Sequence, residues 1–528
     1  MKNFLHLLST LLPAIVQGAV IQRDTIPITL DIENKDLAPD GFTRSTIVAN
    51  GQYPGPAIFA TKGDTLVVTV NNKLTDPSMR RSTSLNFDGI FFNSENEFEE
   101  GTPFVTQCPI VPNDSFTYTV PLGQQAGSFW YHSQLSVQYV DGLRGALIIY
   151  DPEDPHKSLY DVDDESTLIQ LGDWWHNSSV DSLAFFKAND IIPVADSGTF
   201  NGVGRYVGGP ELPFSIVNVE AGKRYRLRVI NEAARSAYNF SIDSHNFTLI
   251  EADGENLDPL TANVVPILAG QRYSLVLEAN QPVGNYWINA PFSGGSPTRN
   301  PNQNATLSRG ILRYAGAEEA DPTDPMTAGP SEEDAVTAIE AELRPLNSEP
   351  APDADVTITF EVAFTEDTGG TGWRINNISY QSPEVPTLVK VLDGANEDSD
   401  FNVTEHTIIL PANATVEVNF PPNDDDELHP FHLHGMNFWL VKSNSGEANT
   451  ENPIRRDVVG VGSEGTTIRF RTDKPGPWFF HCHIMWHMSV GLGSVFLVDP
   501  EGTRDVVKPN EEWLQACPKY NALPADEK

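Results

Sequence analysis

Short runs of β-branched and aromatic residues, separated by clusters of turn-forming residues, recur along the whole chain. Examples are Thr65–Val70, Arg224–Asn231 and Thr467–Arg471. Val, Ile, Thr, Phe and Tyr favour the pleated backbone, and many short strands with turns between them are typical of sandwiches and barrels. The 40 Pro and 39 Gly residues interrupt helices. The pattern therefore predicts an all-β fold.

A length of 528 residues exceeds one ordinary hydrophobic core, so we expect several domains. One joint follows the strand-like run Ala146–Tyr150, at an acidic, Pro-containing turn over 151–155. A second, broader joint is the acidic, Pro-rich linker 315–354, in which Glu332–Leu343 is predicted as a short helix capped by Ser331. The expected domains are 19–150, 156–314 and 355–528, the last with a C-terminal tail.

The first 18 residues have the pattern of a cleavable secretory signal peptide. Lys2 precedes an apolar run over Phe4–Val16, which is too short to span a bilayer and ends in small residues before Ala19. Export agrees with eight glycosylation sequons. Their acceptors are Asn113, Asn177, Asn239, Asn246, Asn304, Asn377, Asn402 and Asn413. We therefore predict a secreted, extracellular glycoprotein.

The formal net charge is −38. Such a surface repels nucleic acid and anionic membranes, so neither is an expected partner. The chain has three cysteines. In an exporting pathway Cys108 and Cys517 can form a disulfide bond between the first and last domains, and Cys482, which stands between two histidines, remains for a metal.

Histidines concentrate around that cysteine. Residues i and i+2 of a strand face the same side, so each His-x-His pair presents two imidazoles to one cavity while Cys482 points to another. A thiolate with two imidazoles and a weak axial neighbour is the ligand set of an electron-transfer copper. The predicted set is His429, Cys482 and His487, with Leu492 as an axial group that does not bind.

The chain also resembles the fungal laccase-type multicopper oxidases over essentially all of its mature length. The resemblance rests on the copper motif around Cys482 and on Thr106–Ile110, Phe129–Ser133, Tyr139–Gly145, Gly172–His176, Asn201–Arg205 and Gly284–Trp287. It implies three cupredoxin-like Greek-key domains, type 1 copper in the last one, and a trinuclear copper cluster between the first and the last. It further implies one-electron oxidation of phenols or aromatic amines, with reduction of dioxygen to water.

The sequence departs from the family where four His-x-His pairs should build the trinuclear cluster. Asn86 and Asp88 replace the first pair, and Gln134 replaces the second member of the next. The histidines that remain are His132, His432, His434, His481 and His483. Asn and Gln amides are poor copper ligands beside imidazole, so we predict that this cluster is absent or incomplete.

The resemblance assigns the remaining ligands to the three copper positions of the trinuclear cluster. The type 2 position keeps His432 and has Asn86. One type 3 position has His132 and His483 with Asp88, and the other has His434 and His481 with Gln134.

Two further departures concern the second domain. The family's other disulfide is replaced by apolar residues, Val140 and approximately Ala234. Arg235 stands near the position of the family's substrate-orienting carboxylate, with Glu232 close by. If Arg235 faces the type 1 copper pocket, the usual recognition of phenols would be disfavoured.

Three functional hypotheses follow. In the first, the protein is a pseudo-laccase that forms a heterodimer with a catalytically complete laccase and assists oxidative phenol coupling in pigment or secondary-metabolite biosynthesis. In the second, it is an active copper-dependent oxidase of phenolic substrates with an altered cluster. The third, a copper store or one-electron carrier, ranks last. Aromatic and phenolic small molecules are the expected ligands in the first two.

Overall fold

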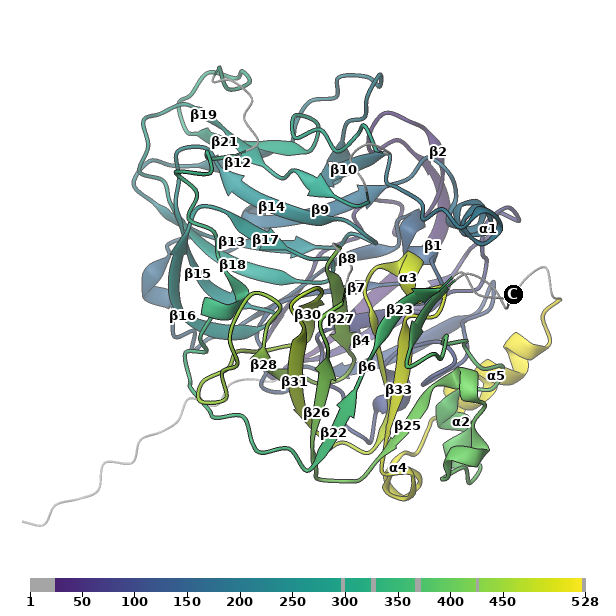
Figure 1. The fold of residues 1–528 in the computed structure, drawn as a ribbon. Coiled ribbons are helices and arrows are strands. Elements are labelled where there is room, and N and C mark those ends of the chain that lie inside the picture. Colours follow the sequence, from purple (N-terminus) through teal and green to yellow (C-terminus); the bar gives the residue numbers. More distant parts are fainter. Residues whose placement is uncertain (1–23, 296–299, 324–328, 366–371, 424–426, 525–528) are drawn as a thin grey trace, which may run out of the picture.

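The computed structural model describes residues 24–295, 300–323, 329–365, 372–423 and 427–524 (Figure 1). The predicted signal peptide, 1–18, lies outside the described residues. Strands dominate the chain, which confirms the predicted all-β class. No helix of the described residues is long and apolar enough to cross a membrane. The sheets fall into three groups along the sequence, called here the first, second and third domains.

The first domain contains two four-stranded sheets. One has the order β2 (Arg44–Ala49), β1 (Thr25–Leu37), β4 (Thr65–Asn72), β6 (Ser115–Pro121), and the other β3 (Ile58–Thr61), β8 (Arg144–Tyr150), β7 (Gly127–His132), β5 (Asn86–Asp88). The 3₁₀ helix η1 (Glu97–Glu99) lies between β5 and β6 and so links the two sheets, and η2 (Gln138–Asp141) lies between β7 and β8 of the second sheet. Along β4 every second side chain is buried, as the alternation of the sequence predicts for a strand with one face on a core.

The second domain has a seven-stranded and a six-stranded sheet. The first has the order β11 (Val203–Gly204), β10 (Ser197–Phe200), β9 (Leu168–Trp174), β13 (Arg224–Asn231), β18 (Arg272–Glu278), β15 (Phe247–Ala252), β16 (Glu255–Ala262). The second has the order β12 (Ile216–Val219), β21 (Arg309–Tyr314), β19 (Asn285–Asn289), β14 (Ala237–Ile242), β17 (Val265–Ile267), with β20 (Phe292–Ser293) on β14. Its helices are η3 (Lys157–Leu159), η4 (Glu165–Thr167) and α1 (Ser179–Asn189).

The third domain has two five-stranded sheets and a two-stranded ribbon. The first sheet has the order β22 (Val356–Thr359), β26 (Thr415–Phe420), β31 (Thr466–Arg471), β28 (Phe438–Lys442), β29 (Arg455–Arg456). The second has the order β25 (Thr407–Leu410), β33 (Gly493–Val498), β32 (Gly476–Cys482), β27 (His429–Leu433), β30 (Val458–Val461). The ribbon consists of β23 (Val362–Thr365) and β24 (Gly372–Ile375). The helices are η6 (Asp398–Asp400), η7 (Val403–Glu405), α2 (Thr387–Leu392), α3 (Met485–Met488), α4 (Pro500–Val506) and α5 (Glu511–Asn521).

The helix predicted over Glu332–Leu343 is wrong. Ser331 does accept a hydrogen bond from the backbone of Asp334, but the turn goes no further, and only η5 (Glu340–Glu342) follows. The intervening backbone is extended because it pairs with the second domain: the amide of Val264 donates to the carbonyl of Val336, and the amide of Ala338 donates to the carbonyl of Val264. These non-local hydrogen bonds replace those of a helix.

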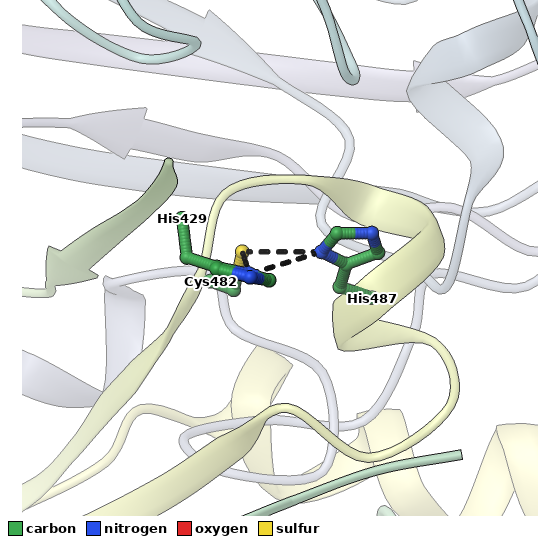
Figure 2. Close-up of side chains that lie close together, drawn as sticks. All are labelled: His429, Cys482 and His487. Atoms are coloured by element: carbon green, nitrogen blue, oxygen red, sulfur yellow. Dashed lines mark hydrogen bonds between the residues drawn. The ribbon is translucent and has the colours of Figure 1, made fainter. Parts of the chain in front are cut away.

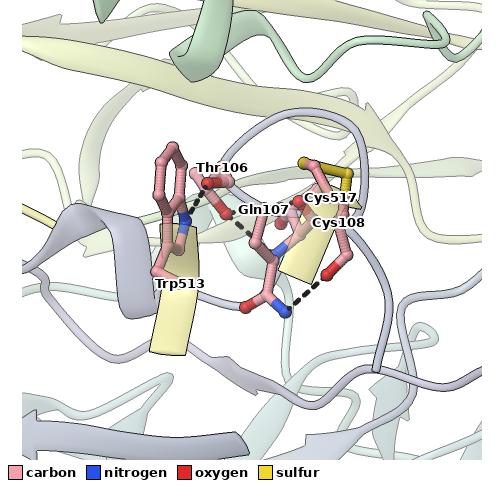
Figure 3. The surroundings of a disulfide bond; sticks show 6 residues. Thr106, Gln107, Cys108, Trp513 and Cys517 are labelled. Carbon is pink, nitrogen blue, oxygen red and sulfur yellow. Dashed lines mark hydrogen bonds between the residues drawn. A yellow bond between two sulfur atoms is a disulfide. The ribbon is translucent and has the colours of Figure 1, made fainter. Parts of the chain in front are cut away.

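The C-terminal helix α5 returns to the first domain. Cys517 on α5 forms a disulfide bond with Cys108, with 5.0 Å between their Cα atoms, as predicted (Figure 3). Beside it, the indole nitrogen of Trp513 donates to the carbonyl of Thr106 over 2.9 Å. The last helix therefore holds the third domain against the first.

The eight predicted glycosylation acceptors are all exposed: Asn113, Asn177, Asn239, Asn246, Asn304, Asn377, Asn402 and Asn413. Their exposure leaves every sequon accessible, and their modification stays a prediction.

Candidate metal centre

Three side chains of the third domain converge on one point. His429 begins β27, Cys482 ends β32, and His487 lies on α3, directly after the turn that follows β32 (Figure 2). β27 and β32 are paired with Phe431 opposite Cys482, so the two strands bring His429 and Cys482 to the same end of the sheet. All three side chains are fully buried.

The spacing of these atoms fits a single ion. Sγ of Cys482 lies 3.8 Å from Nδ1 of His429 and 3.9 Å from Nδ1 of His487, and the two nitrogens are 3.2 Å apart. Metal–nitrogen distances near 2 Å and metal–sulfur distances near 2.3 Å put trigonal ligands about 3.5 to 3.8 Å apart. The two imidazoles and one thiolate are also the donor set of electron-transfer copper.

The surroundings keep these ligands in the form that binds a metal. Burial, followed by the charges of His429 and Arg235, holds the pKa of His487 well below its usual value, so the ring stays neutral. Trp373 covers both rings, with its centroid 4.5 Å from that of His429 and 4.7 Å from that of His487. Leu492, the predicted axial residue, is fully buried, and its carbonyl accepts the amide proton of Cys482.

The other five predicted histidines form a second cluster where β7, β27 and β32 approach β5. They are His132, His432, His434, His481 and His483, and each is exposed by 2% or less. Within each His-x-His pair the ring centroids are 4.7 Å apart on β27 and 5.8 Å apart around Cys482. The strands thus bring together every imidazole that the spacing assigned to this cluster.

Asp88 lies among three of these imidazoles. Its Oδ1 is 3.1 Å from Nε2 of His132 and 3.7 Å from Nε2 of His432, and its Oδ2 is 2.8 Å from Nε2 of His483. Burial alone would raise the pKa of Asp88, but His132 and His432 outweigh it and hold that pKa well below the usual range. Asp88 is therefore a carboxylate, and with His132 and His483 it could hold a metal ion.

The other half of the cluster contains two imidazoles and two amides. Nε2 of His434 lies 2.9 Å from Nε2 of His481, which is also 3.2 Å from the amide nitrogen of Gln134. The amide nitrogen of Asn86 donates to the Glu100 carboxylate over 2.6 Å. Oδ1 of Asn86 and Oε1 of Gln134 are buried and have no hydrogen-bond partner among the described residues. This half therefore offers a metal two imidazoles and two neutral amides.

Sequence reasoning missed the residues that orient the imidazoles from behind. Oε1 of Glu100 lies 2.5 Å from Nδ1 of His434, the hydroxyl of Thr102 lies 3.1 Å from the same atom, and the carbonyl of Asp457 lies 3.0 Å from Nδ1 of His432. Glu100 follows Glu97 and Glu99 in an acidic stretch that has the composition of a solvated loop. No pattern in that stretch distinguishes the buried carboxylate.

Arg235 lies near the first metal centre, where its charge helps to lower the pKa of His487. Its guanidinium pairs with Glu427 over 3.1 Å and donates to the carbonyl of Pro193 over 3.0 Å. Pro193 lines a cavity of about 600 Å³, together with Trp175, whose ring packs against Trp486 on α3. The predicted apolar residues Val140 and Ala234 are both fully buried. The cationic side chain of Arg235 thus contacts a residue that lines this cavity and also acts electrostatically on His487.

Comparisons with known proteins identify the class. Three family models described as multicopper oxidase match residues 31–154, 165–317 and 380–502. The chain therefore belongs to the multicopper oxidase family, whose members bind copper.

Within that family the chain is of the laccase type. It is 46% identical over 515 residues to Laccase-2 of Agaricus bisporus, which covers 95% of this chain and 96% of that protein. It is 47% identical to Laccase-4 of Thanatephorus cucumeris, with 86% of each covered. A solved laccase from Botrytis aclada superposes with a TM-score of 0.83 at 31% identity, covering 95% of this chain and 92% of that one. The predicted cupredoxin-like architecture is thereby confirmed.

Proposed function

We propose that this protein is a secreted pseudo-laccase, which binds type 1 copper at His429, Cys482 and His487 but does not reduce dioxygen by itself. The observation that supports the proposal is that Asn86, Asp88 and Gln134, at positions where the resemblance leads us to expect imidazoles, lie among the buried histidines of the second cluster. A copper ion at the first centre would supply one-electron redox chemistry. The chain's own part is to hold the three ligands in place and exclude water from them.

The three replacements act together against a trinuclear cluster. Asn86 is committed to Glu100 through its amide hydrogens. Gln134 approaches His481 with an amide nitrogen, which has no lone pair for a metal. An amide oxygen is a weaker copper ligand than imidazole, so even a reoriented amide would bind copper poorly.

Copper content and oxygen uptake test this proposal. We expect the purified protein to show the intense blue absorption of a thiolate-bound copper and to lose it on Cys482→Ser. We expect no oxygen consumption above buffer when a phenol is added. Catalytic oxygen uptake by the unmodified chain would disprove the proposal.

We further propose that the protein assists a complete laccase, as a heterodimer, in coupling phenolic radicals during pigment or secondary-metabolite biosynthesis. The support is that the fold and the first metal centre are preserved beside an altered second cluster. Comparison of coupling products tests this role, with the complete laccase alone, with this protein added, and with Cys482→Ser added. Identical yield and regiochemistry in all three reactions would rule it out.

The second candidate function is a working oxidase with an altered cluster. The contacts of Asp88 with imidazole nitrogens favour it, because a carboxylate is itself a metal ligand. The two candidates differ in copper content, since a working oxidase should approach the full complement of its family and consume oxygen with a phenol.

A further inference from the structure

The carboxylate of Asp88 meets two imidazoles that come from different domains. Asp88 ends β5 and His132 ends β7, both in the first domain, and His483 follows β32 in the third. One oxygen of Asp88 faces His132 over 3.1 Å and the other faces His483 over 2.8 Å. Potential ligand atoms of the three residues all lie within 4.8 Å of one another, and all three side chains are buried. The triad is thus a compact set of two nitrogens and a carboxylate.

Hydrogen bonding at His132 fixes which of its ring nitrogens faces Asp88. Nδ1 of His132 lies 2.9 Å from the carbonyl of Ser133, which can only accept, so Nδ1 carries the proton. Nε2, the other ring nitrogen, therefore faces the carboxylate oxygen of Asp88 over 3.1 Å. A divalent ion placed between these two atoms would bind both of them.

The same hydrogen-bonding arrangement is found at histidines that bind metal ions in proteins. A histidine that binds a metal through one nitrogen almost always donates its other N–H to a carbonyl or carboxylate, which fixes the tautomer. His132 does so to Ser133, and His432 has Nδ1 3.0 Å from the carbonyl of Asp457. Nε2 of His432 is 3.7 Å from Asp88, which places this ring beside the triad as a further ligand.

The other half of the cluster has no carboxylate facing its Nε2 atoms. Glu100 lies behind His434, against Nδ1, and the two Nε2 atoms of His434 and His481 face each other over 2.9 Å. The third side chain there is the neutral amide of Gln134. A divalent ion therefore gains anionic ligation only on the Asp88 side.

We propose that Asp88, His132 and His483 bind one divalent transition-metal ion, with His432 at hand as a fourth ligand. The chain would then be a two-site metalloprotein with one ion at each centre, in place of a trinuclear cluster. Nitrogen and carboxylate ligands follow the general order of divalent affinities, so Cu²⁺ should bind more tightly than Co²⁺ or Zn²⁺. The inference goes beyond the proposed function, because the partner role does not require a second ion.

Metal binding in a Cys482→Ser background isolates this site from the thiolate centre. Apo protein is dialysed against limiting Cu²⁺ and, separately, Zn²⁺, and bound metal is measured by elemental analysis with EPR of the copper form. We expect one Cu²⁺ per chain, with nitrogen hyperfine structure and without intense blue absorption. Adding Asp88→Asn should weaken Cu²⁺ binding by at least about tenfold, since even outer-shell changes have effects of that size.

His434→Gln is the matched control, because it removes an imidazole of the same cluster from the half without a facing carboxylate. It should leave the bound ion in place, and Asp88→His should restore binding lost in Asp88→Asn. Retention of Cu²⁺ by Asp88→Asn, or its loss in His434→Gln, would overturn the proposal. Three ions per chain in the Cys482→Ser protein would also overturn it, in favour of a trinuclear cluster.

Folding is checked by the thermal unfolding of each apo variant. Added Cu²⁺ should raise the Tm of the Cys482→Ser protein but not that of Cys482→Ser with Asp88→Asn. If Asp88→Asn does not fold, His132→Gln provides the same measurement. None of these experiments depends on oxygen uptake or on a partner, so their failure is distinguishable from a failure of the proposed function.

Discussion

Asn86, Asp88 and Gln134 each differ from imidazole in a separate way. Asp88 adds a negative charge among three rings, Asn86 is tied to Glu100, and Gln134 approaches His481 with an amide nitrogen. Only Asp88 is itself a good ligand for a divalent ion. We therefore expect metal binding to be retained on the Asp88 side of the cluster and weakened on the side of Asn86 and Gln134.

The combined variant Asn86→His, Asp88→His and Gln134→His should regain oxygen-dependent phenol oxidation. The backbone of β5 and β7 already places these positions beside the surviving imidazoles, since Asn86 is paired with His132 across the two strands. We expect copper per chain to rise toward the full complement of the family, together with measurable oxygen uptake. The same variant with His434→Gln added is the control and should lose the uptake. An inactive triple variant that is fully loaded with copper would show that other residues also block the reaction.

Glu232 should make stability depend on pH. Burial raises the pKa of Glu232 to about 7, although Gln170 and Arg144 oppose the shift. Because the folded chain holds a proton that the unfolded chain releases, this contribution is complete below pH 4.5, declines as the pH rises, and is lost above about pH 7. The change amounts to about 3 kcal/mol. Glu232→Gln, measured by thermal unfolding between pH 4 and 8, should be less sensitive to pH than the parent, and parallel curves would contradict this assignment.

At the scale of strands and helices, the sequence predicts what depends on local alternation. The runs at Thr65–Val70 and Arg224–Asn231 lie in β4 and β13, and the His-x-His pairs share faces because β27 and β32 are extended. Such local patterns do not predict contacts between residues that are far apart in the sequence. The segment around Val336 is extended because it bonds to Val264, and Glu100 is buried where its carboxylate bonds to His434 and Asn86.

The disulfide of α5 should matter for stability more than for the first metal centre. Cys108→Ser with Cys517→Ser opens a loop of 409 residues. Loss of a native disulfide typically costs about 2–5 kcal/mol. The remaining contacts of α5 with the first domain include the hydrogen bond of Trp513 to Thr106 and a surface ion pair of Lys519 with Asp114. They also include the edge-to-face ring pairs Phe98–Trp513 and Phe104–Tyr520. We therefore expect a lower Tm and faster proteolysis after residue 507.

The blue absorption should be unchanged in that double variant below its Tm, because the ligands come from β27, β32 and α3 and their donor atoms face one another. Trp513→Phe is a milder control that removes one hydrogen bond and keeps the disulfide. Loss of colour without unfolding would mean that α5 supports the metal centre directly.

Over the whole molecule, acidic surface charge coexists with buried ion pairs between domains. The net charge is −38, yet several arginines are fully buried and paired across domain boundaries. Arg272 of the second domain binds Asp457 of the third through two contacts of 2.6 and 2.7 Å, and Arg456 binds Asp253 over 2.8 Å. The carbonyl of Asp457 also orients His432. The domain interface and the second cluster therefore share one residue.

Asp457→Asn should destabilise the whole molecule and loosen the second cluster. It leaves Arg272 buried with only the more distant carboxylate of Asp253, at 3.7 Å, and breaking a buried pair costs about 3–5 kcal/mol. Arg455→Gln is the matched control, since Arg455 pairs with Glu255 and Glu349 while 34% exposed. Pairs of that kind contribute about 0–1 kcal/mol. Urea unfolding should separate the two variants clearly, and Cu²⁺ affinity in the Cys482→Ser background should fall for Asp457→Asn alone. Equal stability losses in both variants would show that the interface does not depend on the buried pair. An unchanged Cu²⁺ affinity in Asp457→Asn would show that His432 is held by the backbone of β27 and β30.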